Sequence, residues 1–145
     1  MPAINRVKYY QPNSYFHIYN RGNNKEEIFF SEQDYEVFRA ITRRVLQEEY
    51  CEVIVDTFCL MPNHFHFLVY QVTTRAIEIL MRKTMTRYVM YINKKYGRVG
   101  RLFQDIYKAA YVPPAKVAKT RQYILDNPIN AGFSDWKHVG RGYKL

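Results

Sequence analysis

Two histidines, His64 and His66, lie in a short apolar segment, His64–Val72 (HFHFLVYQV). Residues two apart on a β-strand point to the same face, so the two imidazoles are expected to project together. Two imidazoles on one face can share a divalent metal ion. An H-x-H pair alone is more often two surface histidines. Two histidines are also an incomplete set of metal ligands, so a metal site here requires a third ligand from elsewhere in the chain.

A predicted helix near the end of the chain offers that ligand. Tyr123 and Asn127 are spaced i, i+4 and therefore lie on one helix face. The side-chain oxygen of Asn127 is a ligand that Mg²⁺ or Mn²⁺ accepts. A metal-bound phosphate one turn away would face the phenol oxygen of Tyr123, as covalent phosphoryl transfer requires. Taken singly, Tyr123 is better explained as a core aromatic and Asn127 as a helix cap before Pro128.

The elements that must position these residues follow from hydrophobic spacing. The predicted strands are Phe16–Asn20, Glu52–Leu60, His64–Val72 and Arg101–Val112. The predicted helices are Ser31 to about Glu49 with Ser31 as N-cap, Arg75–Tyr96 with Gly97 as its stop, and Ala115–Asn127, which ends near Pro128.

The order β-α-β-β-α-β-α indicates an α+β fold: a ferredoxin-like antiparallel sheet with helices on one face and an additional C-terminal helix that carries Tyr123. Met61-Pro62-Asn63 supplies the turn of a hairpin between the second and third strands. Residues 1–145 are expected to form one domain, with a loosely ordered extension from Ala131 to Leu145.

Composition points to a polyanionic partner. The net charge is +9, and the segment from Arg75 to Arg121 holds twelve Lys/Arg against two acids (12 − 2 = +10), so the rest of the chain has a net charge of −1. Nucleic acid is the expected partner. The 14 tyrosines and 9 phenylalanines add aromatic surface that can stack on unpaired bases. The basic residues expected to contact DNA are Arg21, Arg82, Lys83, Arg87, Lys94, Lys95, Arg98 and Arg101.

The chain is expected to stay in the cytoplasm, because no apolar run is long enough to cross a bilayer and the first ten residues lack the apolar centre of a signal peptide. Cys51 and Cys59 are eight residues apart within an apolar segment. That separation matches no zinc pattern, so both are expected to be buried free thiols.

Four sequence blocks resemble one protein family. Met61–Val69 (MPNHFHFLV) resembles the M-P-N-H-x-H signature of HUH transposases with a single catalytic tyrosine, and the nearest group within them is the REP-associated tyrosine transposases. Phe16–Gly22 (FHIYNRG), Gly100–Gln104 (GRLFQ) and Tyr123–Gly132 (YILDNPINAG) agree with it, in the expected order. The resemblance covers roughly Ser14 to Phe133.

This resemblance implies a specific chemistry. His64, His66 and Asn127 would bind Mg²⁺ or Mn²⁺ on the scissile phosphate, and Tyr123 would attack it, leaving a 5′-phosphotyrosine and a free 3′-OH. That 3′-OH can attack another phosphotyrosine, so strand transfer needs no ATP. The implied substrate is single-stranded DNA with hairpins, such as repetitive extragenic palindromes.

Some residues depart from the family pattern. Asp105-Ile106-Tyr107 stands where Gly-Arg-Tyr is common, and Tyr107 is a rival nucleophile on a predicted strand. His17 is expected to make structural hydrogen bonds, and His138 has no visible partner in the sequence.

Two other functions compete with the transposase interpretation. A ferredoxin-like sheet with exposed aromatics also suits a non-catalytic nucleic-acid-binding module. A metal phosphoesterase that uses water needs the histidines but not Tyr123. A homodimer is also compatible with the sequence, which leaves open whether Tyr123 meets His64 and His66 in cis or in trans.

Overall fold

The computed structural model of the protein describes residues 10–48 and 52–145. The strands are β1 (Ser14–Arg21), β2 (Val53–Met61), β3 (His64–Gln71), β4 (Lys108–Val112) and β5 (Val139–Arg141). The α-helices are α1 (Glu32–Leu46), α2 (Ala76–Tyr96) and α3 (Val117–Asn130), and short 3-10 turns are η2 (Asn23–Lys25), η3 (Pro114–Lys116) and η4 (Gly142–Lys144). Within these described ranges, no helix is long and apolar enough to cross a membrane.

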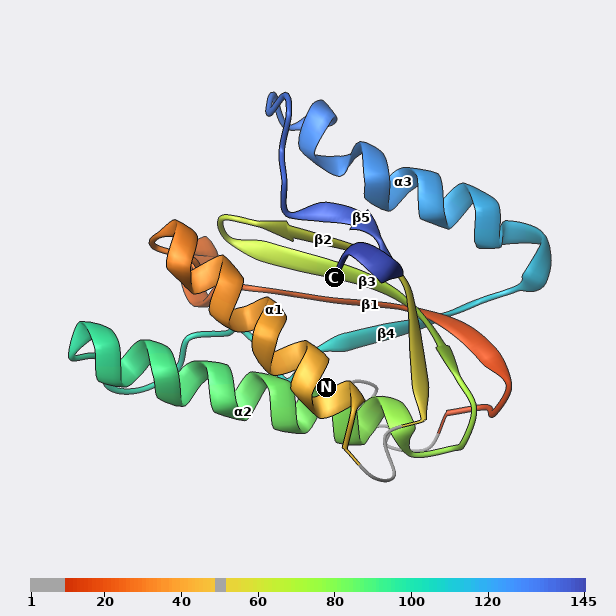
Figure 1. Cartoon of the computed structure of the whole chain (residues 1–145), viewed down its shortest axis with the longest axis horizontal. Helices are drawn as coiled ribbons and strands as arrows, with labels where there is room; N and C mark the ends of the chain where they lie inside the picture. Colours follow the sequence, from red (N-terminus) through yellow and green to blue (C-terminus); the bar gives the residue numbers. More distant parts are fainter. Residues whose placement is uncertain (1–9, 49–51) are drawn as a thin grey trace.

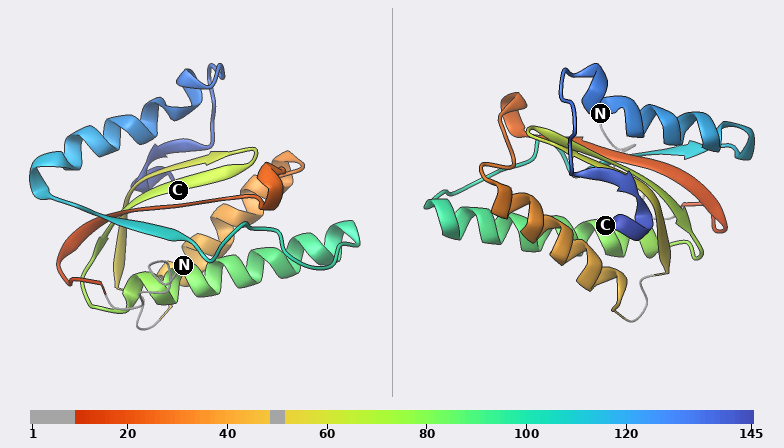
Figure 2. Two further views of the ribbon diagram at one scale, coloured as in Figure 1. Left: turned by 180° about the vertical axis from the view of Figure 1, so that it is seen from behind. Right: turned by 45° about the horizontal axis from the view of Figure 1, so that its top comes forward.

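The strands form one antiparallel sheet in the order β4-β1-β3-β2-β5. Helices α1 and α2 cover one face of the sheet, and α3 crosses the opposite face (Figures 1 and 2). The predicted α+β, ferredoxin-like fold is therefore confirmed, together with the additional C-terminal helix.

The two faces of the sheet are packed differently. Phe65, Phe67 and Val69 of β3 point into the main core beneath α1 and α2. Leu68, on the other face, belongs to a smaller apolar cluster with Ile124 of α3. Because side chains alternate along a strand, His64 and His66 share the α3 face with Leu68.

A buried carboxylate joins the two helices of the core face. Asp34 of α1 pairs with the Lys95 ammonium at 2.8 Å and accepts hydrogen bonds from the Phe30 N–H and from the hydroxyls of Tyr91 and Tyr96. Burial by itself raises the pKa of Asp34, but the hydrogen bonds from the ammonium and the phenols outweigh it and leave the pKa below its ordinary value.

The fourth strand is shorter than predicted. The sequence indicated a strand over Arg101–Val112, whereas β4 begins at Lys108. Before that point, Phe103 forms an isolated bridge with Gly22 and the residues on either side of it are bends. The Asn20 side-chain N–H₂ donates to the carbonyl oxygens of residues 105 and 106, both at 2.9 Å, and so replaces ladder bonds there.

The third helix is longer than the predicted Ala115–Asn127, because Pro128 lies inside it. The fixed φ of proline is compatible with a helix, but the residue lacks one backbone donor and its ring crowds the carbonyl four residues earlier. The helix ends where the N–H groups of Ala131 and Phe133 donate to the carbonyls of Asn127 and Pro128.

The prediction that the residues from Ala131 to Leu145 form a loosely ordered extension is wrong. Residues Val139–Arg141 pair with β2 as β5, and the indole N–H of Trp136 donates to a β2 carbonyl at 2.7 Å. His138 is fully buried, stacks on Tyr35 at 4.2 Å between ring centroids, and bonds to Glu32 at 2.9 Å. This segment is held by strand pairing and by one buried ring, neither of which requires an apolar run.

Cys59 is a buried free thiol, as predicted. Cys51 lies outside the described residues.

Candidate active site

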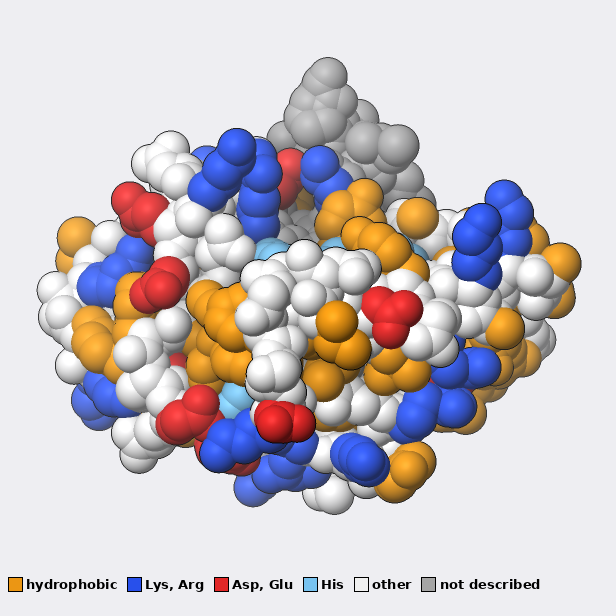
Figure 3. All heavy atoms as spheres, turned by 90° about the horizontal axis from the view of Figure 1, so that it is seen from above, with side chains coloured by type: hydrophobic (Ala, Val, Ile, Leu, Met, Phe, Trp, Pro, Cys, Tyr) orange, Lys and Arg blue, Asp and Glu red, His pale blue; other side chains and the backbone are white. Residues whose placement is uncertain are grey.

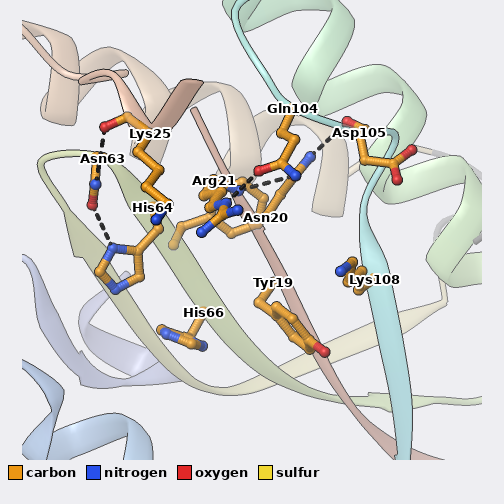
Figure 4. A pocket seen from close by; sticks show the side chains of 11 residues that line it. Tyr19, Asn20, Arg21, Lys25, Asn63, His64, His66, Gln104, Asp105 and Lys108 are labelled. Carbon is orange, nitrogen blue, oxygen red and sulfur yellow. Dashed lines mark hydrogen bonds between the residues drawn. The ribbon is translucent and has the colours of Figure 1, made fainter. Parts of the chain in front are cut away.

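Strand register determines which side chains share the α3 face of the sheet. Between β1 and β3, Arg21 lies opposite His64 and Tyr19 opposite His66. On the other side of β1, Tyr19 lies opposite Lys108 of β4. The ladder therefore aligns an imidazole, a phenol and an ammonium across three neighbouring strands (Figure 4).

His64 follows directly after the hairpin turn, and the turn orients its ring. Its Nδ1 lies 2.8 Å from Asn63 Oδ1, and the Asn63 Nδ2 donates to the Lys25 carbonyl at 3.2 Å. That second bond fixes the amide with its oxygen toward the ring, so His64 Nδ1–H donates. The lone pair of His64 is consequently on Nε2.

His66 is paired with a histidine from the neighbouring strand. Its Nδ1 lies 2.9 Å from His17 Nε2, and the two rings stack 5.0 Å apart. Burial lowers the pKa of His66 to about 3, with smaller contributions from His17 and His64, and burial lowers the pKa of His17 to about 4. Both rings are therefore neutral at neutral pH. When His66 Nδ1–H donates to His17, the His66 Nε2 lone pair is free for a metal ion.

Near Tyr123, an apolar side chain and an ion pair fix helix α3 to the sheet. Ile124 is fully buried against β2 and β3. The Arg121 guanidinium donates to both carboxylate oxygens of Asp56, at 2.8 and 3.0 Å. Because Ile124 points into the sheet, Tyr123 and Asn127 lie toward the β1 side of the helix.

This docking brings the four predicted site residues together within one chain. Asn127 Oδ1 lies 3.1 Å from His64 Nε2. The Tyr123 ring lies 5.8 Å from that of His66 and 6.0 Å from that of His17, edge-on to both, and is 52% exposed. The nucleophile candidate is accessible, whereas His66 beneath it is buried.

The arrangement of these groups fits a divalent cation. His64 Nε2 carries a lone pair, and the oxygen that faces it at 3.1 Å is also an acceptor. Two ligands at right angles and about 2.1 Å from one ion lie about 3.0 Å apart, which accounts for this contact. Burial lowers the pKa of His64 more than the contact with Asn127 raises it, so this ring too is held neutral. The amide oxygen is a ligand type that suits Mg²⁺ or Mn²⁺, whereas imidazole nitrogens suit transition metals, so Mn²⁺ fits this mixed set better than Mg²⁺ does.

Two adjoining hollows flank the histidines. One, of about 550 Å³, extends from His64 and His66 past Arg21 and Lys25 (Figure 4). The other, also about 550 Å³, extends from His66 toward Tyr123 and Lys119. Tyr19 and His66 line both. Seen from the α3 side, histidine side chains are visible beside the helix, with Lys and Arg side chains around them (Figure 3).

The basic residues predicted from the charge run are mostly not brought to this face. Arg21 lines the first hollow, where its Nε donates to Gln104. On α2, across the sheet, Arg82 pairs with Glu78, and Lys83 and Arg87 pair with Glu48.

The remaining predicted basic residues lie at or after the end of α2. Lys95 pairs with Asp34, and Lys94 is exposed in the last turn of the helix. Arg98 donates to the Asn93 side-chain oxygen at 2.8 Å, and Arg101 to the Gln104 carbonyl at 2.7 Å. Of the predicted set, Arg21 is thus the residue that lines a hollow beside the histidines.

Tyr107 is placed on the opposite side of the sheet from the histidines. It is almost fully buried against α2, and burial together with the hydrogen bond that its hydroxyl donates to Tyr10 raises its pKa. A buried phenol on this face does not face the His64–His66 pair.

A second group of potential ligands lies at the start of α1. Ligand atoms of Glu32, Glu36 and His138 lie within 4.8 Å of one another. The His138 Nε2 is already bonded to Glu32 Oε1, the Lys137 ammonium lies 3.4 Å from the same oxygen, and the Arg39 guanidinium approaches the other ring nitrogen of His138. We interpret this group as an anchor for the C-terminal segment, because the Glu32 carboxylate is already paired with Lys137 and His138.

Sequence reasoning missed several residues of the site. His17, Tyr19, Lys108, Lys116 and Lys119 all line the hollows beside the histidines. Two of them stand in the block FHIYNRG that carried the family resemblance, which was the available signal. The three lysines were part of the charge run but were not distinguished from its other members.

Comparisons with known proteins agree with these features. Residues 10–127 match the family described as IS200-like transposases. Among solved structures, the chain is similar to a REP-associated tyrosine transposase bound to a REP hairpin, with a TM-score of 0.75, 13% identity, and coverage of 90% of this chain and 78% of that one. It is also similar to a bacterial tRNA-His guanylyltransferase-like protein in complex with GTP, with a TM-score of 0.51, 13% identity, and coverage of 87% and 70%. At such identities the likeness is one of fold. A search of curated proteins finds no significant match.

Proposed function

Because the chain belongs to the IS200-like transposase family, whose members cut and transfer DNA, we propose that it is a metal-dependent strand transferase that uses Tyr123 as its nucleophile. The observation that carries the proposal is the meeting of α3 with the histidine pair: Asn127 Oδ1 lies 3.1 Å from His64 Nε2, and the Tyr123 ring lies 5.8 Å from that of His66. These residues come from segments far apart in the sequence, and the docking of α3 on the sheet brings them together.

In the proposed reaction, His64, His66 and Asn127 hold Mg²⁺ or Mn²⁺. The ion, when bound, supplies Lewis-acid stabilisation of the charge on the scissile phosphate. The Tyr123 oxygen bonds to phosphorus as the bond from phosphorus to the 3′ oxygen breaks. The phenol gives up its proton and the departing oxygen gains one, leaving a 5′-phosphotyrosine and a free 3′-OH. Attack by a 3′-OH on the phosphotyrosine reverses the step and rejoins strands without ATP.

Single-stranded DNA with hairpins is the substrate that we propose. The solved transposase with the same fold is bound to a REP hairpin. The Tyr123 ring is half exposed beside an open hollow, which suits an unpaired strand.

The test is covalent adduct formation. The protein is incubated with labelled hairpin-bearing single-stranded DNA and Mn²⁺, and denaturing gels are examined for a protein–DNA band. Tyr123→Phe should abolish the band, whereas Tyr111→Phe, at a tyrosine of similar exposure, should retain it. Cleavage without an adduct would indicate a phosphoesterase that uses water, and binding alone would indicate a non-catalytic module.

A further inference from the structure

We propose that the hollow between Tyr19 and Lys119 binds one unpaired nucleotide of the DNA strand, with its base stacked on Tyr19 and its phosphates beside Lys116 and Lys119. The proposal rests on the proposed function for the identity of the strand as DNA. Its binding test does not require that the protein cuts.

The hollow is open to solvent because α3 covers only part of its sheet face. The helix packs mainly on β2 and β3, so part of β1 and β4 is left open beside it. Ala110 of β4 lies opposite His17, and its small side chain forms part of the lining. The volume of about 550 Å³ is within the range of small-ligand sites.

Tyr19 supplies an aromatic surface between the two hollows. Its ring centroid lies 5.0 Å from that of His17 and 6.0 Å from that of His66, so two neutral imidazoles support it. The side chain is only partly buried and lines both hollows. Stacking on a supported tyrosine is available to every base, because each base has a π-face.

Three exposed lysines surround this ring. Lys108 lies opposite Tyr19 in the ladder (Figure 4), and Lys116 and Lys119 line the hollow from η3 and α3. Within the described part of the chain, no acidic side chain forms an ion pair with any of the three, unlike the paired lysines and arginines of α2. Lys119 is one helical turn before Tyr123 and therefore shares its face. The three positive charges favour an anion, and the neighbouring aromatic ring favours one that carries a base. A phosphodiester of a nucleic-acid strand meets both requirements.

The first measurement is the affinity for a fluorescently labelled single-stranded oligonucleotide by anisotropy, in the Tyr123→Phe background so that nothing is cut. Tyr19→Ala should weaken binding about 5- to 100-fold through lost stacking, and Tyr19→Phe should leave it within about twofold. Tyr143→Ala, at an 84% exposed tyrosine just after β5 at the other edge of the sheet, is the matched control and should have no effect. Lys116→Gln and Lys119→Gln should each reduce the salt dependence of binding by about 0.7 in the log–log slope.

The second measurement locates the nucleotide. Each base of the oligonucleotide is removed in turn, and the effect of Tyr19→Ala is measured on each abasic strand. The proposal expects the effect to disappear at one position and to persist at the others. An effect of equal size on every strand, or no effect on any, would overturn it.

Filling the hollow gives an independent check, because Ala110 is exposed on an edge strand and tolerates a larger side chain. Ala110→Leu should weaken binding with no change in the thermal unfolding midpoint, and unchanged affinity would contradict the proposal. If the protein passes these tests but forms no adduct, the nucleotide site stands and Tyr123 is refuted as the nucleophile. If it forms the adduct but fails these tests, Tyr123 stands as the nucleophile and the nucleotide site is refuted.

Discussion

Replacing Asn127 with alanine removes the oxygen that faces His64 Nε2 at 3.1 Å. Asn127 is only partly buried, so the change leaves the packing of Ile124 and the Asp56–Arg121 ion pair in place. Losing even a hydrogen-bond partner of a metal ligand lowers metal affinity about 10- to 100-fold. Losing a ligand should cost at least as much, and 10- to 100-fold corresponds to about 1.4–2.8 kcal/mol.

The assay is titration of Mn²⁺ into the protein with detection of the free ion by electron paramagnetic resonance. Asn127→Asp keeps an oxygen in place and should retain binding. Glu36→Gln, in the other group of potential ligands, is the matched control and should leave the affinity unchanged. If Asn127→Ala binds Mn²⁺ as wild type does while Glu36→Gln loses it, the metal lies at the start of α1 and the reasoning fails.

Three further outcomes follow from the same contacts. Because α3 packs on its own sheet, a mixture of Tyr123→Phe and His64→Ala proteins should form no adduct with DNA; a restored adduct band would mean that chains exchange the helix. His17→Ala removes the bond to His66 Nδ1 and should weaken Mn²⁺ binding about 10- to 100-fold without altering the circular dichroism spectrum, with partial recovery in His17→Gln; unchanged affinity would remove His17 from the site. Asp34→Asn should lower the free energy of unfolding at pH 7 by about 3 kcal/mol. Because the folded-state pKa of Asp34 lies below its ordinary value of 3.8, this contribution is present above that pH and is lost as the pH falls through the folded pKa. Urea titrations should therefore show the difference shrinking below about pH 4, and a constant difference would contradict this origin.

The sequence was sufficient where local spacing decides the geometry. The alternation His64-Phe65-His66 places both imidazoles opposite the core, as the structure confirms. The i, i+4 spacing of Tyr123 and Asn127 places them on one face of α3, and the Pro62-Asn63 turn closes the hairpin. These relations involve neighbours within a few residues, so no long-range information is needed.

Long-range register was beyond sequence reasoning. The bond between His17 and His66 joins residues 49 positions apart, and the alignment of Tyr19 with Lys108 depends on a second strand pairing. No local pattern distinguishes a histidine that supports His66 from any other strand histidine. Pairing registers are determined by the whole sheet, so the single-chain sequence leaves them open.

Charge patterns were also ambiguous. The run from Arg75 to Arg121 predicted a basic surface, but tertiary contacts decide which of its members are free. Lys83 and Arg87 of α2 form ion pairs with Glu48, whereas Lys116 and Lys119 line the hollow beside Tyr123. The excess positive charge predicted a polyanionic partner, but it did not indicate which basic side chains would contact that partner.

The central claim is that Tyr123 becomes covalently joined to DNA. It is tested most directly by digesting the protein–DNA adduct and locating the modified residue by tandem mass spectrometry. The account predicts a nucleotide on the peptide that contains Tyr123, and its absence when His64 and His66 are both replaced with alanine. A nucleotide attached to Tyr107, Tyr111 or any other residue would contradict it.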